Sequence, residues 1–492
     1  MYRKIIITFL IIFTSGCATN PVSGIPDFVT ITEQQEISIG ASYHKQILEE
    51  NKIIDNKELN DYFQKLGESI AKESHRPNLQ WYFTLIDDPT FNAFATPGGY
   101  VYMYRGMLNY FNSEAELAGV IGHEIAHITA RHAVRGMSTA QVTGLLLGIL
   151  QSNVPGGQLT GNAFNLVNVI INRGYSRKFE LEADQLGEEY LERLNYDPSA
   201  MSAFLKTLQY SDELEIKIAK EEDREPNIGY HGIFSTHPDH EKRISALDKN
   251  DQKNKKMKVN KEKFLKLLDG SVYGSSPEEG YVKNSVFYHP ILAIKFNIHE
   301  DWKLQNEPDK LIITKKDSNI TLRADDLLAD DLENGLTPQK YLENGINKSS
   351  FLSSNELIKS EKFSYNNLEG YSHLYSTKNF IEEKYKRFTV IFDINNEKTK
   401  PKAWISVTNL KDISDDNEVQ MMLKSFSKMP QAEIEKSKGL RIKVIRFRDG
   451  MSYDKLSKSS PLGKYAIDKL RLLNGHYPDK NPIVGDLIKI VE

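Results

Sequence analysis

The segment that most constrains the fold is residues 122–132, which read Gly-His-Glu-Ile-Ala-His-Ile-Thr-Ala-Arg-His. His123 and His127 are four residues apart, and Glu124 follows the first of them. On an α-helix, residues four apart lie on one face about one turn from each other. Two imidazoles in this arrangement can bind one zinc ion, and the Glu124 carboxylate can take a proton from a water held beside it. The alternative is a helix that carries two ordinary histidines.

The flanking sequence indicates a buried helix around this motif. Ser113 and Glu116 have the spacing of a capping box, which marks a helix start. Apolar residues then recur at helical spacing through the motif, at Leu117, Val120, Ile121, Ile125 and Ile128. We therefore predict a helix that begins near residue 113 and buries a broad apolar face.

A catalytic zinc site needs a third protein ligand and an open position. Glu180 and Asp184 are four apart on a second helical pattern, so they can face the metal together. We predict that Glu180 is the ligand and that Asp184 hydrogen-bonds the free ring nitrogen of a ligating histidine. His132 follows His127 by five residues, whereas metzincins place their third histidine six residues on. We therefore predict that His132 is a structural or surface histidine.

With these residues in hand, the chain resembles the CAAX prenyl protease family of zinc metallopeptidases, and more closely its bacterial lipoprotein branch. The resemblance implies an α+β fold, in which a mainly helical, gluzincin-type domain contains a small sheet. It also implies one zinc ion per chain, the ligands His123, His127 and Glu180, and Glu124 as the general base. The motifs that carry it occur in the family's order, at residues 91–99, 123–127, 175–177, 180–184 with Gly187, and 236–238 with Arg243.

The same resemblance implies roles for His237 and Arg243. In the prenyl protease branch, residues at these positions stabilise the oxyanion of the tetrahedral intermediate, a task suited to basic donors. In the periplasmic branch, the equivalent histidine can occupy the fourth zinc position and displace the water, which gives a self-inhibited enzyme. We hypothesise that His237 has one or both roles. The β-rich run at residues 100–103 is expected to border the cleft, where its edge can pair with an extended substrate.

The amino-terminal residues resemble a bacterial lipoprotein signal. Arg3 and Lys4 precede an apolar run at residues 5–13, which is too short to span a bilayer, and small residues lead to the single cysteine, Cys17. We predict a signal peptide at residues 1–16, lipidation of Cys17 and a tether at residues 17–30. By resemblance, Ala18 favours the outer membrane, so the expected location is the periplasm, with a lipid anchor. A plain secretory signal is the alternative.

The length of 492 residues favours two or three domains. We predict the metallopeptidase domain at residues 31–248 and a lysine-rich linker at 249–284. Alternating apolar residues predict an α+β accessory domain at 285–430, in which we recognise no catalytic cluster. Residues 439–492 resemble a LysM-like module, which implies peptidoglycan binding; a small packing domain without a glycan site is the alternative.

The resemblance implies a zinc metalloendopeptidase of the cell envelope that hydrolyses misfolded or stalled envelope proteins, outer-membrane β-barrels above all. The expected partners are unfolded polypeptides, the outer-membrane assembly machinery, peptidoglycan and, through the lipid anchor, the membrane. The net charge of −4 gives no general attraction to nucleic acid. Two alternatives remain open: a chaperone-like assembly scaffold whose zinc is capped by His237, and a peptidoglycan peptidase.

Overall fold

The computed structural model describes most of the chain and divides it into two compact units. Unit 1 comprises residues 1–274 and 440–492, and unit 2 comprises residues 275–439. The predicted signal peptide, His237 and residues 249–256 of the predicted linker lie outside the described residues. In the part that is described, no helix is both long and apolar enough to cross a membrane. The described residues are 17–140, 174–226, 240–247, 257–274, 276, 280–283, 285–307, 309–347, 355–378, 383–394, 400–437 and 439–492.

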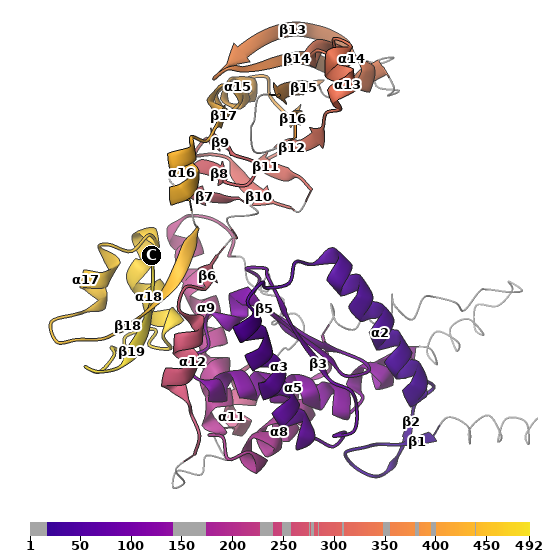
Figure 1. Cartoon of the computed structure of the whole chain (residues 1–492), viewed down its shortest axis with the longest axis vertical. Helices are drawn as coiled ribbons and strands as arrows, with labels where there is room; N and C mark the ends of the chain where they lie inside the picture. Colours follow the sequence, from indigo (N-terminus) through magenta and orange to yellow (C-terminus); the bar gives the residue numbers. More distant parts are fainter. Residues whose placement is uncertain are drawn as a thin grey trace, which may run out of the picture. The chain divides into compact units, whose positions relative to one another are not determined.

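Unit 1 is built around one buried helix, α5 (Figure 1). This helix packs against α3, α8 and α9, and every residue of it except Glu116 is buried. As predicted, the helix starts at Ser113, whose side chain accepts a hydrogen bond from the Glu116 N–H. The capping box is not completed, because the Glu116 carboxylate accepts from the N–H of Asn112 instead, at 2.8 Å. The helices of this region are α2 (Glu33–Glu50), α3 (Lys57–Lys72), α4 (Arg105–Leu108), α5 (Glu114–Thr129), α8 (Arg177–Arg193), α9 (Ser199–Glu221), α11 (His240–Leu247) and α12 (Lys261–Leu268).

A three-stranded sheet lies beside α5. Its order is β3 (Tyr82–Ile86), β5 (Tyr100–Tyr104) and β4 (Ala93–Thr96), with β3 parallel and β4 antiparallel to β5. The expectation that a substrate pairs with residues 100–103 is wrong, because β5 is the central strand and both of its edges are already paired. The edge strand that packs against α5 is β4.

The segment predicted as a tether is folded. Strands β1 (Cys17–Thr19) and β2 (Pro26–Phe28) form an antiparallel hairpin, after which Val29 and Ile31 are buried in the core. The N–H of Thr30 donates to Ser138 Oγ at 3.0 Å, within a helical stretch at 132–140. Pro21 and Gly24 lie in the connection between the two strands, and the buried Val29 and Ile31 attach the segment to the rest of unit 1.

The C-terminal residues 440–492 pack as part of unit 1. Their sheet has the order β19, β18 and β6, so it takes one strand from the residues before unit 2. Leu487 belongs to the same hydrophobic cluster as the core of α5, and Leu472 and Tyr477 pack with residues of α9. The elements are β6 (Val272–Tyr273), β18 (Leu440–Arg446), α17 (Tyr453–Ser457), a 3₁₀ turn (Gly463–Tyr465), α18 (Ala466–Leu473) and β19 (Leu487–Val491).

A buried lysine fixes this C-terminal segment to the loop before α5. Lys489 is fully buried, and its ammonium group donates to the carbonyl oxygens of Asn109 and Phe111, both at 2.7 Å. Burial lowers the pKa of Lys489 well below its usual range, although the carboxylate of Glu116 opposes the shift. Strand β19 therefore contacts the loop that leads into the helix carrying the His-Glu motif.

Unit 2 contains the predicted α+β domain. A seven-stranded antiparallel sheet has the order β10-β11-β12-β16-β15-β14-β13, and a four-stranded sheet has the order β17-β9-β8-β7. Arg387 is a buried residue of the larger sheet and donates two hydrogen bonds of 2.6 Å to Asp416. The strands are β7 (Tyr281–Lys283), β8 (Val286–His289), β9 (Ile294–Asn297), β10 (Lys303–Asn306), β11 (Leu311–Lys315), β12 (Ser318–Asp326), β13 (Glu356–Tyr365), β14 (Leu368–Lys378), β15 (Glu383–Asp393), β16 (Lys402–Leu410) and β17 (Ser427–Lys428). The helices are α13 (Ala329–Glu333), α14 (Pro338–Asn347), α15 (Asp415–Ser425) and α16 (Gln431–Lys436). The predicted α+β class is confirmed.

Candidate active site

Helices α5 and α8 bring the three predicted zinc ligands together. The Nε2 atoms of His123 and His127 are 3.0 Å apart. The two carboxylate oxygens of Glu180 lie 3.5 Å from these nitrogens, one from each histidine. All three side chains are buried, so their ligand atoms converge in a space shielded from solvent.

This arrangement fits one tetrahedral zinc ion. Ligand atoms about 2.0 to 2.1 Å from a tetrahedral zinc lie roughly 3.3 Å from one another, and the observed separations of 3.0 to 3.5 Å bracket that value. Two imidazoles and one carboxylate are also a donor set that zinc prefers and one that leaves a fourth position open. The residues present therefore suit a catalytic zinc rather than a closed structural site.

Asp184 lies beside the ring of His123. Its Oδ1 lies 2.9 Å from His123 Nδ1, so the opposite nitrogen of the ring is directed at the metal position. Burial raises the pKa of the Asp184 carboxyl, but the charge and hydrogen bonds of Arg243, together with those of His123, bring the pKa down to about 2. Asp184 therefore remains an anion that can orient the imidazole.

Arg243 is buried beside the metal ligands. Its Nε and one terminal nitrogen donate to the two Asp184 oxygens at 2.7 and 2.6 Å. Its other terminal nitrogen lies 3.3 Å from Glu180 Oε2. These contacts support a role in positioning the two acidic residues. The oxyanion role predicted for Arg243 stays a prediction, and His237, its predicted companion, lies outside the described residues.

Glu124 faces a small cavity beside the metal position. The cavity has a volume of about 20 Å³, which is room for about one water molecule. Residues of α5, α9 and α11 line the cavity. Those that are described are Val120, His123, Glu124, Met201, Phe204, Leu205, Leu208 and Arg243. The predicted general base and one metal ligand thus share a space of the size that a reacting water needs.

His132 is the site residue that sequence reasoning missed. It is fully buried, and its Nδ1 lies 2.8 Å from Nδ1 of the ligand His127. A continuous helix would point a residue five positions on in another direction, but α5 ends at Thr129 and Arg131 has a φ of 56°. This left-handed residue turns the chain back toward His127. No periodicity in the sequence reports such a turn at a non-glycine residue.

The two ligand-bearing helices cross at a pair of glycines. A Cβ added at Gly187 would lie 3.0 Å from the backbone nitrogen of His123, and one added at Gly122 would lie 3.3 Å from the carbonyl oxygen of Gly187. These contacts leave no room for a side chain between α5 and α8. The glycines therefore set the helix separation that places Glu180 against the two histidines.

We expect Gly187→Ala to reduce the free energy of unfolding by about 1–3 kcal/mol, the usual cost of overpacking, and to weaken zinc binding. Denaturant unfolding with and without zinc measures both effects. Gly345→Ala is the matched control, because Gly345 is also helical and a Cβ there meets nothing within 4 Å. Equal stability of the two variants would contradict the close crossing.

Comparison with known proteins agrees with this site. Residues 57–251 match the model of peptidase family M48. The chain is 28% identical over 243 residues to the β-barrel assembly-enhancing protease of Escherichia coli (strain K12), covering 47% of each protein. It is 32% identical over 189 residues to the putative β-barrel assembly-enhancing protease of Vibrio cholerae, covering 36% of this chain and 39% of the relative. It is 32% identical over 149 residues to the mitochondrial metalloendopeptidase OMA1 of Arabidopsis thaliana, covering 30% of each.

The chain thus spans about half, or less, of the length of these relatives. The part that matches the family model contains α5, α8 and α11, and with them the three ligands, Glu124, Asp184 and Arg243. The donor set, the adjoining base and the family match all indicate the same chemistry. Residues 57–251 therefore resemble peptidase family M48 and contain a group of side chains able to hold a catalytic zinc ion.

Proposed function

We propose that this chain is a zinc metalloendopeptidase of the cell envelope that hydrolyses misfolded or stalled envelope proteins. The observation that carries the proposal is the convergence of His123, His127 and Glu180 beside Glu124 inside the region that matches peptidase family M48. The substrate class is suggested by the relatives that are named β-barrel assembly-enhancing proteases.

Each side chain of the site has a separate role in peptide hydrolysis. Zinc, when bound, supplies a Lewis acid that polarises the scissile carbonyl and acidifies the attacking water. Glu124 takes the proton of that water and then donates it to the nitrogen of the leaving amine. Asp184 and Arg243 keep His123 and Glu180 in place during these transfers. Burial of all these groups strengthens each electrostatic contact.

Strand β4 supports a preference for extended, unfolded substrates. The N–H of Tyr104 donates to the carbonyl of Asn92 at 2.9 Å, so these two residues form a hydrogen-bonded pair of the antiparallel ladder. Hydrogen-bonded pairs alternate with non-hydrogen-bonded pairs along an antiparallel ladder. The backbone N–H and C=O groups of Ala93 and Ala95 therefore point away from β5. A substrate strand added at this edge would bind through its main chain, largely independent of its sequence.

We also propose that Cys17 is lipidated and that the protein works in the periplasm at the outer membrane. This proposal rests on the charged, apolar and small residues that precede Cys17, and on the similarity to relatives named β-barrel assembly-enhancing proteases. Contact with the assembly machinery and with peptidoglycan, the latter through residues 439–492, belongs to the same proposal. Mass spectrometry of the envelope form would detect a diacylglyceryl group on Cys17, and an unmodified thiol would contradict lipidation.

The decisive experiment is cleavage of a β-barrel outer-membrane protein in two states. One sample is unfolded in urea and diluted into the assay, and the other is folded in detergent. We expect the zinc-loaded chain to cut the unfolded form only, because strand addition needs free main-chain groups. Chelation should abolish cleavage and zinc should restore it. The alternatives give other outcomes: zinc binding with suppression of aggregation but no cleavage indicates a scaffold, and release of muropeptides from sacculi indicates a peptidoglycan peptidase.

A further inference from the structure

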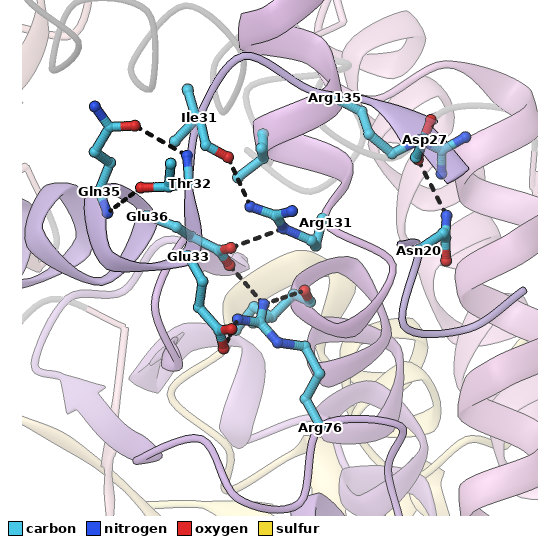
Figure 2. Close-up of polar contacts among 12 residues, drawn as sticks. Asn20, Asp27, Ile31, Thr32, Glu33, Gln35, Glu36, Arg76, Arg131 and Arg135 are labelled. Atoms are coloured by element: carbon cyan, nitrogen blue, oxygen red, sulfur yellow. Dashed lines mark hydrogen bonds and ion pairs between the residues drawn. The ribbon is translucent and has the colours of Figure 1, made fainter. Parts of the chain in front are cut away.

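A line of hydrogen bonds and ion pairs runs from the ligand His127 to the N-terminal hairpin. His127 Nδ1 lies 2.8 Å from His132 Nδ1, and His132 Nε2 lies 3.3 Å from Glu182 Oε2. The same Glu182 oxygen lies 3.3 Å from a terminal nitrogen of Arg135, whose Nε is 3.1 Å from Asp27 Oδ2. Figure 2 shows the far end of this line, where Asp27 lies beside Arg135 and Asn20.

Only one pattern of proton donation satisfies these contacts and leaves His127 able to bind a metal. The Nε2 of His127 faces the other two ligands, so its lone pair must be free and the ring proton must be on Nδ1. That N–H donates to His132, so Nδ1 of His132 is an acceptor. Neutral His132 then carries its proton on Nε2 and donates it to Glu182.

From this geometry we propose that His132 is a positioning residue for the zinc ligand His127, and that Glu182 and Arg135 hold His132 in the accepting tautomer. This inference rests on the zinc site of the proposed function. It gives His127 the same kind of support that Asp184 gives His123, with a neutral imidazole in place of a carboxylate. Partners of ligating imidazoles fix the ring orientation and raise the affinity for the metal.

Aromatic packing holds the same geometry from the side. The ring of His132 stacks on Phe179 with centroids 4.3 Å apart and an interplanar angle of 10°. The guanidinium carbon of Arg135 lies 4.5 Å from the centroid of the Phe179 ring. Tyr175 stacks on His127 at 4.1 Å. Because α8 carries both Glu180 and Glu182, it supplies one metal ligand and the anchor that orients another.

A buried ion cluster holds the turn that brings His132 into place (Figure 2). Arg131 Nε donates to Glu36 Oε2 at 2.9 Å, and its terminal nitrogen donates to the carbonyl of Ile31 at 3.0 Å. The other oxygen of Glu36 accepts from Arg76 at 2.6 Å, and Glu36 is only 1% exposed. A left-handed conformation is strained for a non-glycine residue, and these charge-assisted bonds offset the strain.

The test compares His132→Leu with His132→Asn in the full-length chain. Zinc affinity is measured by competition with a chromophoric chelator, and the ligand field by the visible spectrum of the cobalt-loaded protein. We expect the leucine variant to bind zinc roughly 10–100-fold more weakly and to show a changed cobalt spectrum. The asparagine variant should remain within about threefold of wild type, since its side-chain oxygen takes the place of Nδ1 as the acceptor.

A second pair of variants tests the next link on α8. Glu182→Ala removes the acceptor of the His132 proton and should weaken zinc binding several-fold. Glu189→Ala is the matched control, because Glu189 lies on the same helix and pairs with Arg193 instead. Its zinc affinity should equal that of wild type.

Three results would overturn the inference: unchanged zinc affinity in a folded His132→Leu variant, equal weakening in the leucine and asparagine variants, or equal zinc affinity in the two α8 variants. If His132→Leu does not fold, the α8 pair decides. The readout is metal binding, so it is separate from catalysis. A chain that binds zinc as expected and cleaves nothing would contradict the proposed function and leave this inference intact.

Discussion

The Glu124→Gln variant is expected to bind zinc as the wild type does and to lose nearly all peptidase activity. Glutamine keeps the size of the side chain and leaves the ligands His123, His127 and Glu180 in place. It cannot take a proton, so the water loses its base. General bases contribute roughly 10²- to 10⁴-fold to such rates, and we expect a fall in kcat/KM of that size on an unfolded polypeptide.

Metal content and thermal unfolding should be recorded on the same samples, so that loss of activity is not confused with loss of zinc. Glu192→Gln, an exposed position on α8, is a suitable control for the change of charge. If Glu124→Gln retained most of the wild-type kcat/KM, the general base would have to be another group. If it lost zinc as well, Glu124 would be acting on the metal site itself.

The Lys489→Met variant is expected to destabilise unit 1 by about 3 kcal/mol, because the carbonyl oxygens of Asn109 and Phe111 lose a buried donor. The change also removes the cation that lies near Glu116. A loss of this size in a large unit lowers the melting temperature by roughly 4 to 5 °C. Calorimetry of the zinc-loaded chain at fixed zinc concentration measures it.

The control for this prediction is Lys480→Met, an exposed lysine of the same segment, which should leave the melting temperature unchanged. A Lys489→Met variant as stable as this control would mean that the C-terminal segment adds little to the peptidase unit. Activity adds a second readout, since the loop held by Lys489 leads directly into α5. We expect kcat/KM to fall even at temperatures well below the transition.

The three candidate zinc ligands and Asp184 were predictable because each pair of these residues lies within one uninterrupted helix. His123 and His127, and likewise Glu180 and Asp184, are separated by one turn, so spacing alone fixes their common face. His132 was not predictable in the same way, because the left-handed Arg131 interrupts the helical period between it and His127. That turn depends on Glu36, a residue 95 positions away.

Local sequence patterns also could not predict contacts between segments that are far apart in the sequence. Residues 100–103 were recognisable as a strand, but nothing local indicates that β5 is flanked on both sides. The composition of residues 17–30 suggested a tether, whereas the burial of Val29 and Ile31 depends on partners far along the chain. The elements of residues 440–492 were recognisable, but their attachment through Lys489 depends on carbonyls 378 and 380 residues away.

Unit 1 is built from two segments that are separated in the sequence by unit 2, and this affects the order in which its contacts form during synthesis. Residues 275–439 must be made before Lys489 can reach Asn109 and Phe111. A nascent chain that already contains the zinc ligands therefore lacks the last contact that secures the start of their helix. The loop before α5 therefore gains these two hydrogen bonds only after residues 275–439 and β19 have been translated.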